Sequence, residues 1–178
     1  VGLAGAIAIG LTSWYAQNTY KTALEVSERN AAALRNHLEG DMMHDALRGD
    51  VQRALWAANE KNTTDIESVK NDVKEHSAKF KEYVSENKKL ELSADTKAVL
   101  QKVDEPLNSY INAAEAHVEL AFKDLNAERA QLSKFNEIFS DLEEKMAEAS
   151  DKLAANAAAE AAHAKDQVVV AKTVQLIV

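Results

Sequence analysis

The chain of 178 residues contains 5 glycines, 1 proline and 46% apolar residues, and its net charge is −8. Its length fits one domain, and so few turn-forming residues are typical of an all-α protein. The acidic charge argues against nucleic acid as a partner, and the lack of cysteine excludes thiol catalysis, cysteine-ligated metal clusters and covalent c-type haem attachment.

Both ends of the chain are apolar runs. VGLAGAIAIGLTSWYAQ opens the sequence and DQVVVAKTVQLIV closes it, and neither alone reaches the roughly 20 residues that span a bilayer. Trp14 and Tyr15 are residue types that lie at a membrane–water interface. We therefore interpret 1–15 as the end of a first transmembrane helix, 168–178 as the start of a second, and 16–167 as the domain between them. Two apolar helix ends that pack on each other in a soluble protein are the alternative.

Four helices are predicted from apolar spacing and turn signals, over about 16–60, 64–87, 94–122 and 126–167. Thr63 or Thr64 is a good N-cap for the second helix, and Ser93 for the third. Pro106 lies inside the third helix and should kink or break it. The predicted core face of the second helix comprises Ile66, Val69, Val73, Phe80 and Val84.

The order long, short, short, long predicts an antiparallel up-down four-helix bundle, whose first and last helices continue toward the membrane. At about 1.5 Å rise per residue, Arg48 and Asn136 come to the same height, roughly 50 Å from the membrane. By the same count, His44 is level with Ser140. Nearer the membrane, the first and last helices should form a stalk, for which KLAANAAAEAAHAK is suited because alanine lets helices approach closely.

The segment GDMMHDALRGDV, 40–51, carries an unusual mixture of charged, histidine and methionine residues. At about 100° per residue, one stripe of the first helix comprises His37, Asp41, His44, Arg48 and Leu55. Apolar residues flank it, with Leu34, Leu38, Met42 and Trp56 on one side and Met43, Leu47, Val51 and Ala54 on the other. The expected solvent face comprises Arg35, Glu39, Ala46, Asp50 and Arg53. The stripe is therefore predicted to point into a packed interface.

Three interpretations of this stripe remain open, because a buried charge needs a partner. An internal salt-bridge network could fix the register of a dimer. Alternatively, Arg48 could clamp a small anion with two parallel hydrogen bonds, since Asp45 is its one acidic neighbour at helical spacing. Metal binding through His37, Asp41 and His44 is the third possibility, although the two histidines lie about 10 Å apart along the axis.

Other chemistry is absent from the sequence. His76, His117 and His163 lack ligand spacing and are interpreted as solvated or satisfied histidines. No Ser-His-Asp arrangement, glycine-rich phosphate loop or nucleophile motif appears. We therefore expect neither catalysis nor a cofactor.

The expected arrangement, with two membrane-proximal ends and a distal four-helix bundle, resembles the sensory domain of bacterial methyl-accepting chemotaxis proteins. The pattern of residues in DMMHDALRGDVQRAL adds to this resemblance. The resemblance covers essentially the whole chain. It implies a homodimer in the inner membrane with this domain in the periplasm, and cytoplasmic signalling partners beyond it. It also implies that a small ligand binds between helix one of one subunit and helix four of the other, and that the last helix is displaced slightly in response.

Carried onto this sequence, the resemblance gives Arg48 the role of the ligand-binding arginine of helix one. The candidate ligand-binding set is Arg48, His44, Asp41 and Gln52 on helix one, with Ser133, Asn136 and Ser140 on helix four. Amino-acid receptors of this family use several helix-one arginines, whereas Arg53 falls on the solvent face, which argues against an amino-acid ligand. His44 beside Arg48 could instead serve a di- or tricarboxylate, or make binding depend on pH. A sensor histidine kinase or cyclic-nucleotide enzyme could carry the same module. A ligand-free structural or partner-sensing bundle is the competing class.

Overall fold

A computed structural model describes residues 2–177, without the side chains of 3–5, 63 and 175–177. The chain forms five helices, α1 (Gly2–Glu60), α2 (Thr63–Lys89), α3 (Ala94–Gln101), α4 (Asp104–Lys123) and α5 (Leu125–Ile177). No strand occurs within 2–177, so the predicted all-α class is confirmed. The two expected membrane segments, 1–15 and 168–178, fall partly outside the described residues.

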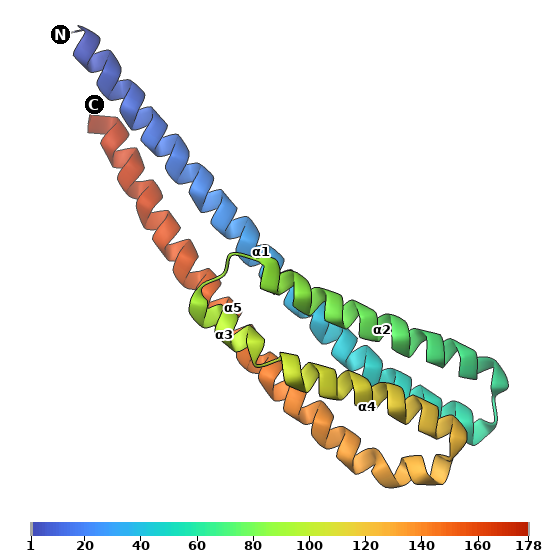
Figure 1. Cartoon of the computed structure of the whole chain (residues 1–178). Coiled ribbons are helices and arrows are strands. Elements are labelled where there is room, and N and C mark those ends of the chain that lie inside the picture. The colour runs from blue at the N-terminus through green and yellow to red at the C-terminus, as the bar shows by residue number, and fades with distance from the viewer. Residues whose placement is uncertain (1, 178) are drawn as a thin grey trace.

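The helices form an elongated molecule with both termini at one end (Figure 1). There α1 and α5 lie side by side as a two-helix stalk, which we define as residues 2–32 and 154–177. Beyond the stalk, α2 and α4 join α1 and α5 to make a bundle, and the short α3 lies where stalk and bundle meet. The α1–α2 and α4–α5 connections lie at the end away from the termini.

One hydrophobic core fills the bundle, from Ala33 on α1 to Leu153 on α5. Its largest fully buried side chains include Leu47, Phe80, Tyr110, Ile111, Phe135 and Leu142, which come from α1, α2, α4 and α5. The predicted core face of α2 is confirmed, because Val69, Val73 and Phe80 are buried and the other two residues are half-buried. The interior is therefore a four-helix core rich in aromatic rings.

Helix boundaries follow local chemistry. Ser93 caps α3 as predicted, with its hydroxyl accepting from the Thr96 amide at 3.2 Å. The predicted cap of α2 was wrong, because Asn62 rather than Thr63 or Thr64 is the N-cap, and its side chain accepts from the Thr64 amide. Asparagine is as good a cap as threonine, and Lys61 with φ 53° turns the chain just before it.

The predicted interruption near Pro106 is confirmed as a break between α3 and α4. Pro106 is the third residue of α4, in the first turn, where its missing N–H leaves no helical hydrogen bond unmade. The break lets α3 pack against α5 while α4 continues through the bundle.

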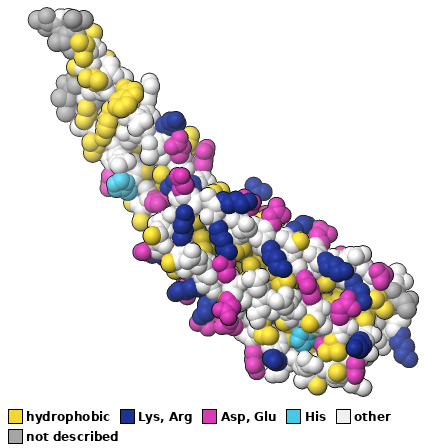
Figure 2. Space-filling view, in the orientation of Figure 1, with side chains coloured by type: hydrophobic (Ala, Val, Ile, Leu, Met, Phe, Trp, Pro, Cys, Tyr) yellow, Lys and Arg dark blue, Asp and Glu magenta, His cyan; other side chains and the backbone are white. Residues whose placement is uncertain are grey.

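The surface differs between stalk and bundle. Figure 2 shows charged side chains spread over the bundle and hydrophobic side chains gathered toward the end with the termini. The large exposed hydrophobic residues of the stalk include Ile7, Ile9, Leu11, Trp14, Leu24 and Val169. Among the described residues, no helix has a stretch long and apolar enough to cross a membrane.

Candidate functional site

Arg48 lies at the edge of the bundle between α1 and α5. Its guanidinium carbon is 4.4 Å from the centre of the Phe139 ring, which is a cation–π contact. Its Nε is buried without a hydrogen-bond partner, and Arg48 forms no ion pair with any residue in 2–177. Asp45, the predicted neighbour, does not pair with it. A half-buried cation without an acidic partner can bind an anion.

His44 lies inside the core beside the same ring. It is 2% exposed and stacks on Phe139 at a centroid distance of 4.1 Å, with the edge of Tyr110 at 4.8 Å. The Tyr110 hydroxyl donates to the His44 backbone carbonyl at 2.8 Å, while Nε2 of the ring has no partner. Burial lowers the pKa of His44, and nearby acids such as Asp45 oppose this shift only in part. His44 is therefore a neutral core residue and does not line a surface site in a single chain.

The heights predicted for the two long helices agree with these contacts. Phe139 touches both Arg48 and His44, and it directly precedes Ser140 and follows Asn136 by one helical turn. Ser140 and Asn136 are exposed, so they lie on the outer surface of α5 at about the height of Arg48.

The remaining predicted site residues are all exposed, and among the described residues no hydrogen bond or ion pair joins them. Asp41 and Gln52 lie on the outer face of α1, and Ser133 lies about two turns before Ser140 on α5. The predicted burial of Asp41 with His44 was wrong, because the Asp41 position turns outward while His37 and His44 turn into the core.

The stripe on α1 was misplaced by part of a turn. Its flank with Leu47, Val51 and Ala54 is buried, but Leu38, Met42 and Trp56 on the other flank are 52%, 60% and 58% exposed. This outer row of α1 has no packing partner among the described residues.

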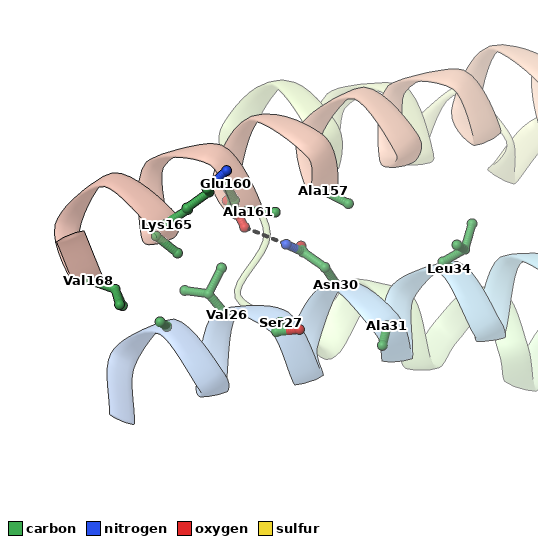
Figure 3. A pocket seen from close by; sticks show the side chains of 12 residues that line it. Val26, Ser27, Asn30, Ala31, Leu34, Ala157, Glu160, Ala161, Lys165 and Val168 are labelled. Carbon is green, nitrogen blue, oxygen red and sulfur yellow. Dashed lines mark hydrogen bonds between the residues drawn. The ribbon is translucent and has the colours of Figure 1, made fainter. Parts of the chain in front are cut away.

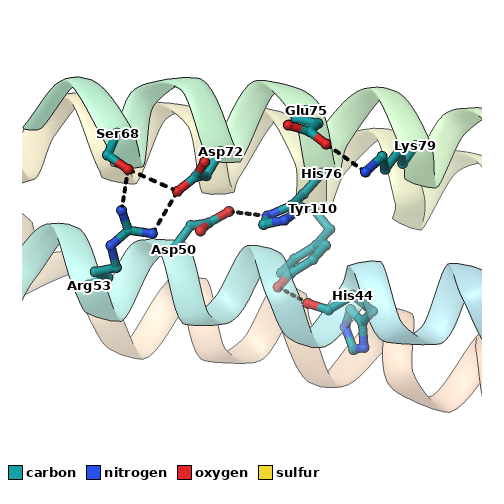
Figure 4. Close-up of polar contacts among 9 residues, drawn as sticks. All are labelled: His44, Asp50, Arg53, Ser68, Asp72, Glu75, His76, Lys79 and Tyr110. Atoms are coloured by element: carbon teal, nitrogen blue, oxygen red, sulfur yellow. Dashed lines mark hydrogen bonds and ion pairs between the residues drawn. The ribbon is translucent and has the colours of Figure 1, made fainter. Parts of the chain in front are cut away.

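The predicted solvent face of α1 was wrong at Asp50, whose side chain is buried, with 4% of the residue exposed. Asp50 accepts from Nδ1 of His76 on α2 at 2.7 Å, as Figure 4 shows. Burial raises the pKa of Asp50, and the hydrogen bond to His76 opposes that rise. The neighbouring Arg53 is half-buried and pairs with Asp72 of α2 at 2.7 Å. These contacts tie α1 to α2, and His76 is a satisfied histidine as the sequence indicated.

The structure does not support the predicted metal site. In the described part of the chain, no three histidine or acidic side chains lie close enough together to hold an ion. His37 is buried in a small cavity with Asn87, whereas Asp41 is exposed. The candidate set His37, Asp41 and His44 is therefore not assembled within one chain.

A groove of about 520 Å³ runs between the two stalk helices (Figure 3). Its walls are mostly alanine and valine from α1 and α5, and one polar bridge crosses it. Asn30 donates to Glu160 at 2.7 Å, and Arg29 lies 3.8 Å from the same carboxylate. The α1 residues that line this groove lie 14 to 25 positions before Arg48, which is roughly 20–40 Å along the helix axis, and Lys165 is the one basic side chain among the described residues of its lining.

Comparison of the chain with protein-family models, with curated proteins and with solved structures finds no match.

Proposed function

We propose that the chain is the extracytoplasmic sensory domain of a transmembrane chemoreceptor of the methyl-accepting type, with a small carboxylate as its ligand. The observation that carries this proposal is Arg48, a half-buried cation without an acidic partner, beside a row of exposed α1 side chains that no other described residue covers. A carboxylate bound at the terminal nitrogens of its guanidinium group would gain charge-assisted hydrogen bonds.

A second copy of the chain completes the proposed site. The outer row of α1 has the apolar residues Leu38, Met42 and Trp56, and Asp45, Gly49 and Gln52 lie between them at spacings of three and four. Such spacing is typical of the contact line between two packed helices, which here would include polar positions at its centre. Two α1 helices joined along it would bring Arg48 of one subunit close to the partner subunit and would also shelter Gln52.

Signal transmission in this proposal is a population shift. A ligand that binds one position of α5 more tightly than another moves the equilibrium between them. Arg48 contacts α5 through Phe139, so a carboxylate at Arg48 acts directly on the helix that runs to the C-terminal end. The output domain would lie beyond that end.

Thermal denaturation of the purified chain tests ligand binding. The panel contains mono-, di- and tricarboxylates and amino acids, each with sodium chloride at the same ionic strength. One carboxylate class should stabilise the fold, by about 2.7 kcal/mol at 100 times its Kd. Arg48→Ala should abolish that stabilisation, whereas Arg35→Ala, an exposed arginine of the same helix, should keep it. No stabilisation by any compound, together with strong destabilisation by Arg48→Ala, would instead indicate a structural role.

Cysteine cross-linking tests the dimer separately, because the chain has no cysteine of its own. Met42→Cys should form a disulfide-linked dimer under mild oxidation, since identical residues of the contact line face each other across a two-fold axis. Glu143→Cys, which is exposed on α5, serves as the control. Equal cross-linking of both variants would contradict the α1 interface.

A further inference from the structure

A buried ion pair joins α4 to α5 at the end of the bundle farthest from the termini. Nδ1 of His117 lies 2.7 and 2.8 Å from the two carboxylate oxygens of Glu128, and Glu128 is 0% exposed. Glu128 lies in the first turn of α5, where the helix dipole favours a negative charge. None of the proposed functions of Arg48 involves this pair.

The pair fixes one imidazole nitrogen and leaves the other free. Glu128 takes Nδ1, and the ring of Phe135 packs against the His117 ring at 4.9 Å, so the imidazole has one orientation. Nε2 is then the ring atom available to a ligand. When the ring carries both protons, Nδ1–H donates to Glu128 and Nε2–H can donate to a bound anion.

The His117 ring forms part of the wall of a groove of about 200 Å³ between α4 and α5. The apolar lining consists of Ala113, Ala116, Leu120 and Ile138, and the polar lining consists of His117, Gln131 and Lys134. No carboxylate lines the groove, although the chain has a net charge of −8. Lys134 makes no ion pair with any described residue.

We propose that this groove is a second binding site, for a short-chain monocarboxylate. Nε2 of His117 and the ammonium of Lys134 bind the carboxylate, with the Gln131 amide as a further donor, and the alkyl chain lies on Ala113 and Ile138. The groove has room for an acid of a few carbons. The site is separate from Arg48 and does not depend on the proposed function.

Propionate titration of the intact chain, labelled with ¹⁵N in its 5 histidines, tests the proposal. Long-range ¹H–¹⁵N spectra follow each ring nitrogen at constant ionic strength, with chloride as the reference anion. The Nε2 resonance of His117 should shift with saturation. Lys134→Gln should weaken the affinity roughly tenfold, because it removes one charge-assisted hydrogen bond from an exposed residue whose loss leaves the core intact.

Two control variants make the result specific. Lys74→Gln removes an exposed lysine of α2 and should leave the affinity unchanged, and Arg35→Ala, at an exposed arginine of α1, should also leave it unchanged. Three results would overturn the proposal: no saturable shift at His117, equal weakening by Lys74→Gln, or equal weakening by Arg35→Ala. Equal affinity for inorganic phosphate would overturn the assignment to a carboxylate with an alkyl chain.

Discussion

Phe139 is the residue through which the bundle core and the proposed ligand site are connected. Its ring is 4% exposed, stacks on His44, meets the edge of Tyr110 at 5.8 Å and carries the Arg48 guanidinium. Phe139→Ala removes all of these contacts and leaves a cavity in the middle of the bundle. Substitutions of this kind in protein cores cost about 3–5 kcal/mol.

For a chain of this size each kcal/mol lowers the melting temperature by about 2–4 °C, so Phe139→Ala should lower it by roughly 6–20 °C. Phe122→Ala is the matched control, because the Phe122 ring is only half-buried against the edge of the core, with Nζ of Lys70 5.9 Å from its centre. Thermal denaturation followed by circular dichroism measures the melting temperature of both variants. If Phe122→Ala cost as much as Phe139→Ala, the central role given to Phe139 would be refuted.

Two further predictions concern buried histidines. Burial lowers the pKa of His37 and His44 below the 6.5 of the unfolded chain, so the unfolded state binds more protons and stability should fall as the pH drops below about 6.5. Urea unfolding between pH 5 and 8 should show this, with a weaker dependence in His44→Leu, and identical profiles would contradict it. His117→Leu strands the buried Glu128 carboxylate and should cost about 3–5 kcal/mol, whereas His117→Leu with Glu128→Leu should recover most of that loss. An additive double-variant cycle would show that the two residues are not coupled.

The helical class and most helix ends could be predicted from the sequence because their causes are local. Ser93 caps the helix that follows it, and Pro106 restricts the residues around it whatever the rest of the chain does. The error at the start of α2 arose among Asn62, Thr63 and Thr64, three adjacent residues that are all good caps. Only the backbone turn at Lys61 distinguishes them.

Which side chains of α1 are buried could be predicted only in part. Periodicity gives the angles between residues around the helix axis, but not the directions in which the neighbouring helices lie. His37 and His44 were correctly assigned to the interior. Asp50 was assigned to solvent because its partner, His76, comes from another helix, and no signal within α1 indicates that pairing. Glu128 was missed for the same reason, since a carboxylate in the first turn of a helix ordinarily faces solvent.

The polar contacts between α1 and α5 are distributed unevenly along the molecule, and this bears on the proposed displacement of α5. In the stalk, among the described residues, Glu160 alone forms them, with Asn30 and Arg29, and the surrounding walls are alanine and valine. Small apolar walls slide past one another with little change in buried area. In the bundle, by contrast, the ring of Phe139 contacts His44, Tyr110 and Arg48, and Arg129 of α5 donates to Asn59 of α1 at 2.7 Å. A shift of α5 along its axis therefore disturbs more contacts in the bundle than in the stalk. In the proposed function, a carboxylate at Arg48 would change the balance between the two positions of α5 through one of these contacts.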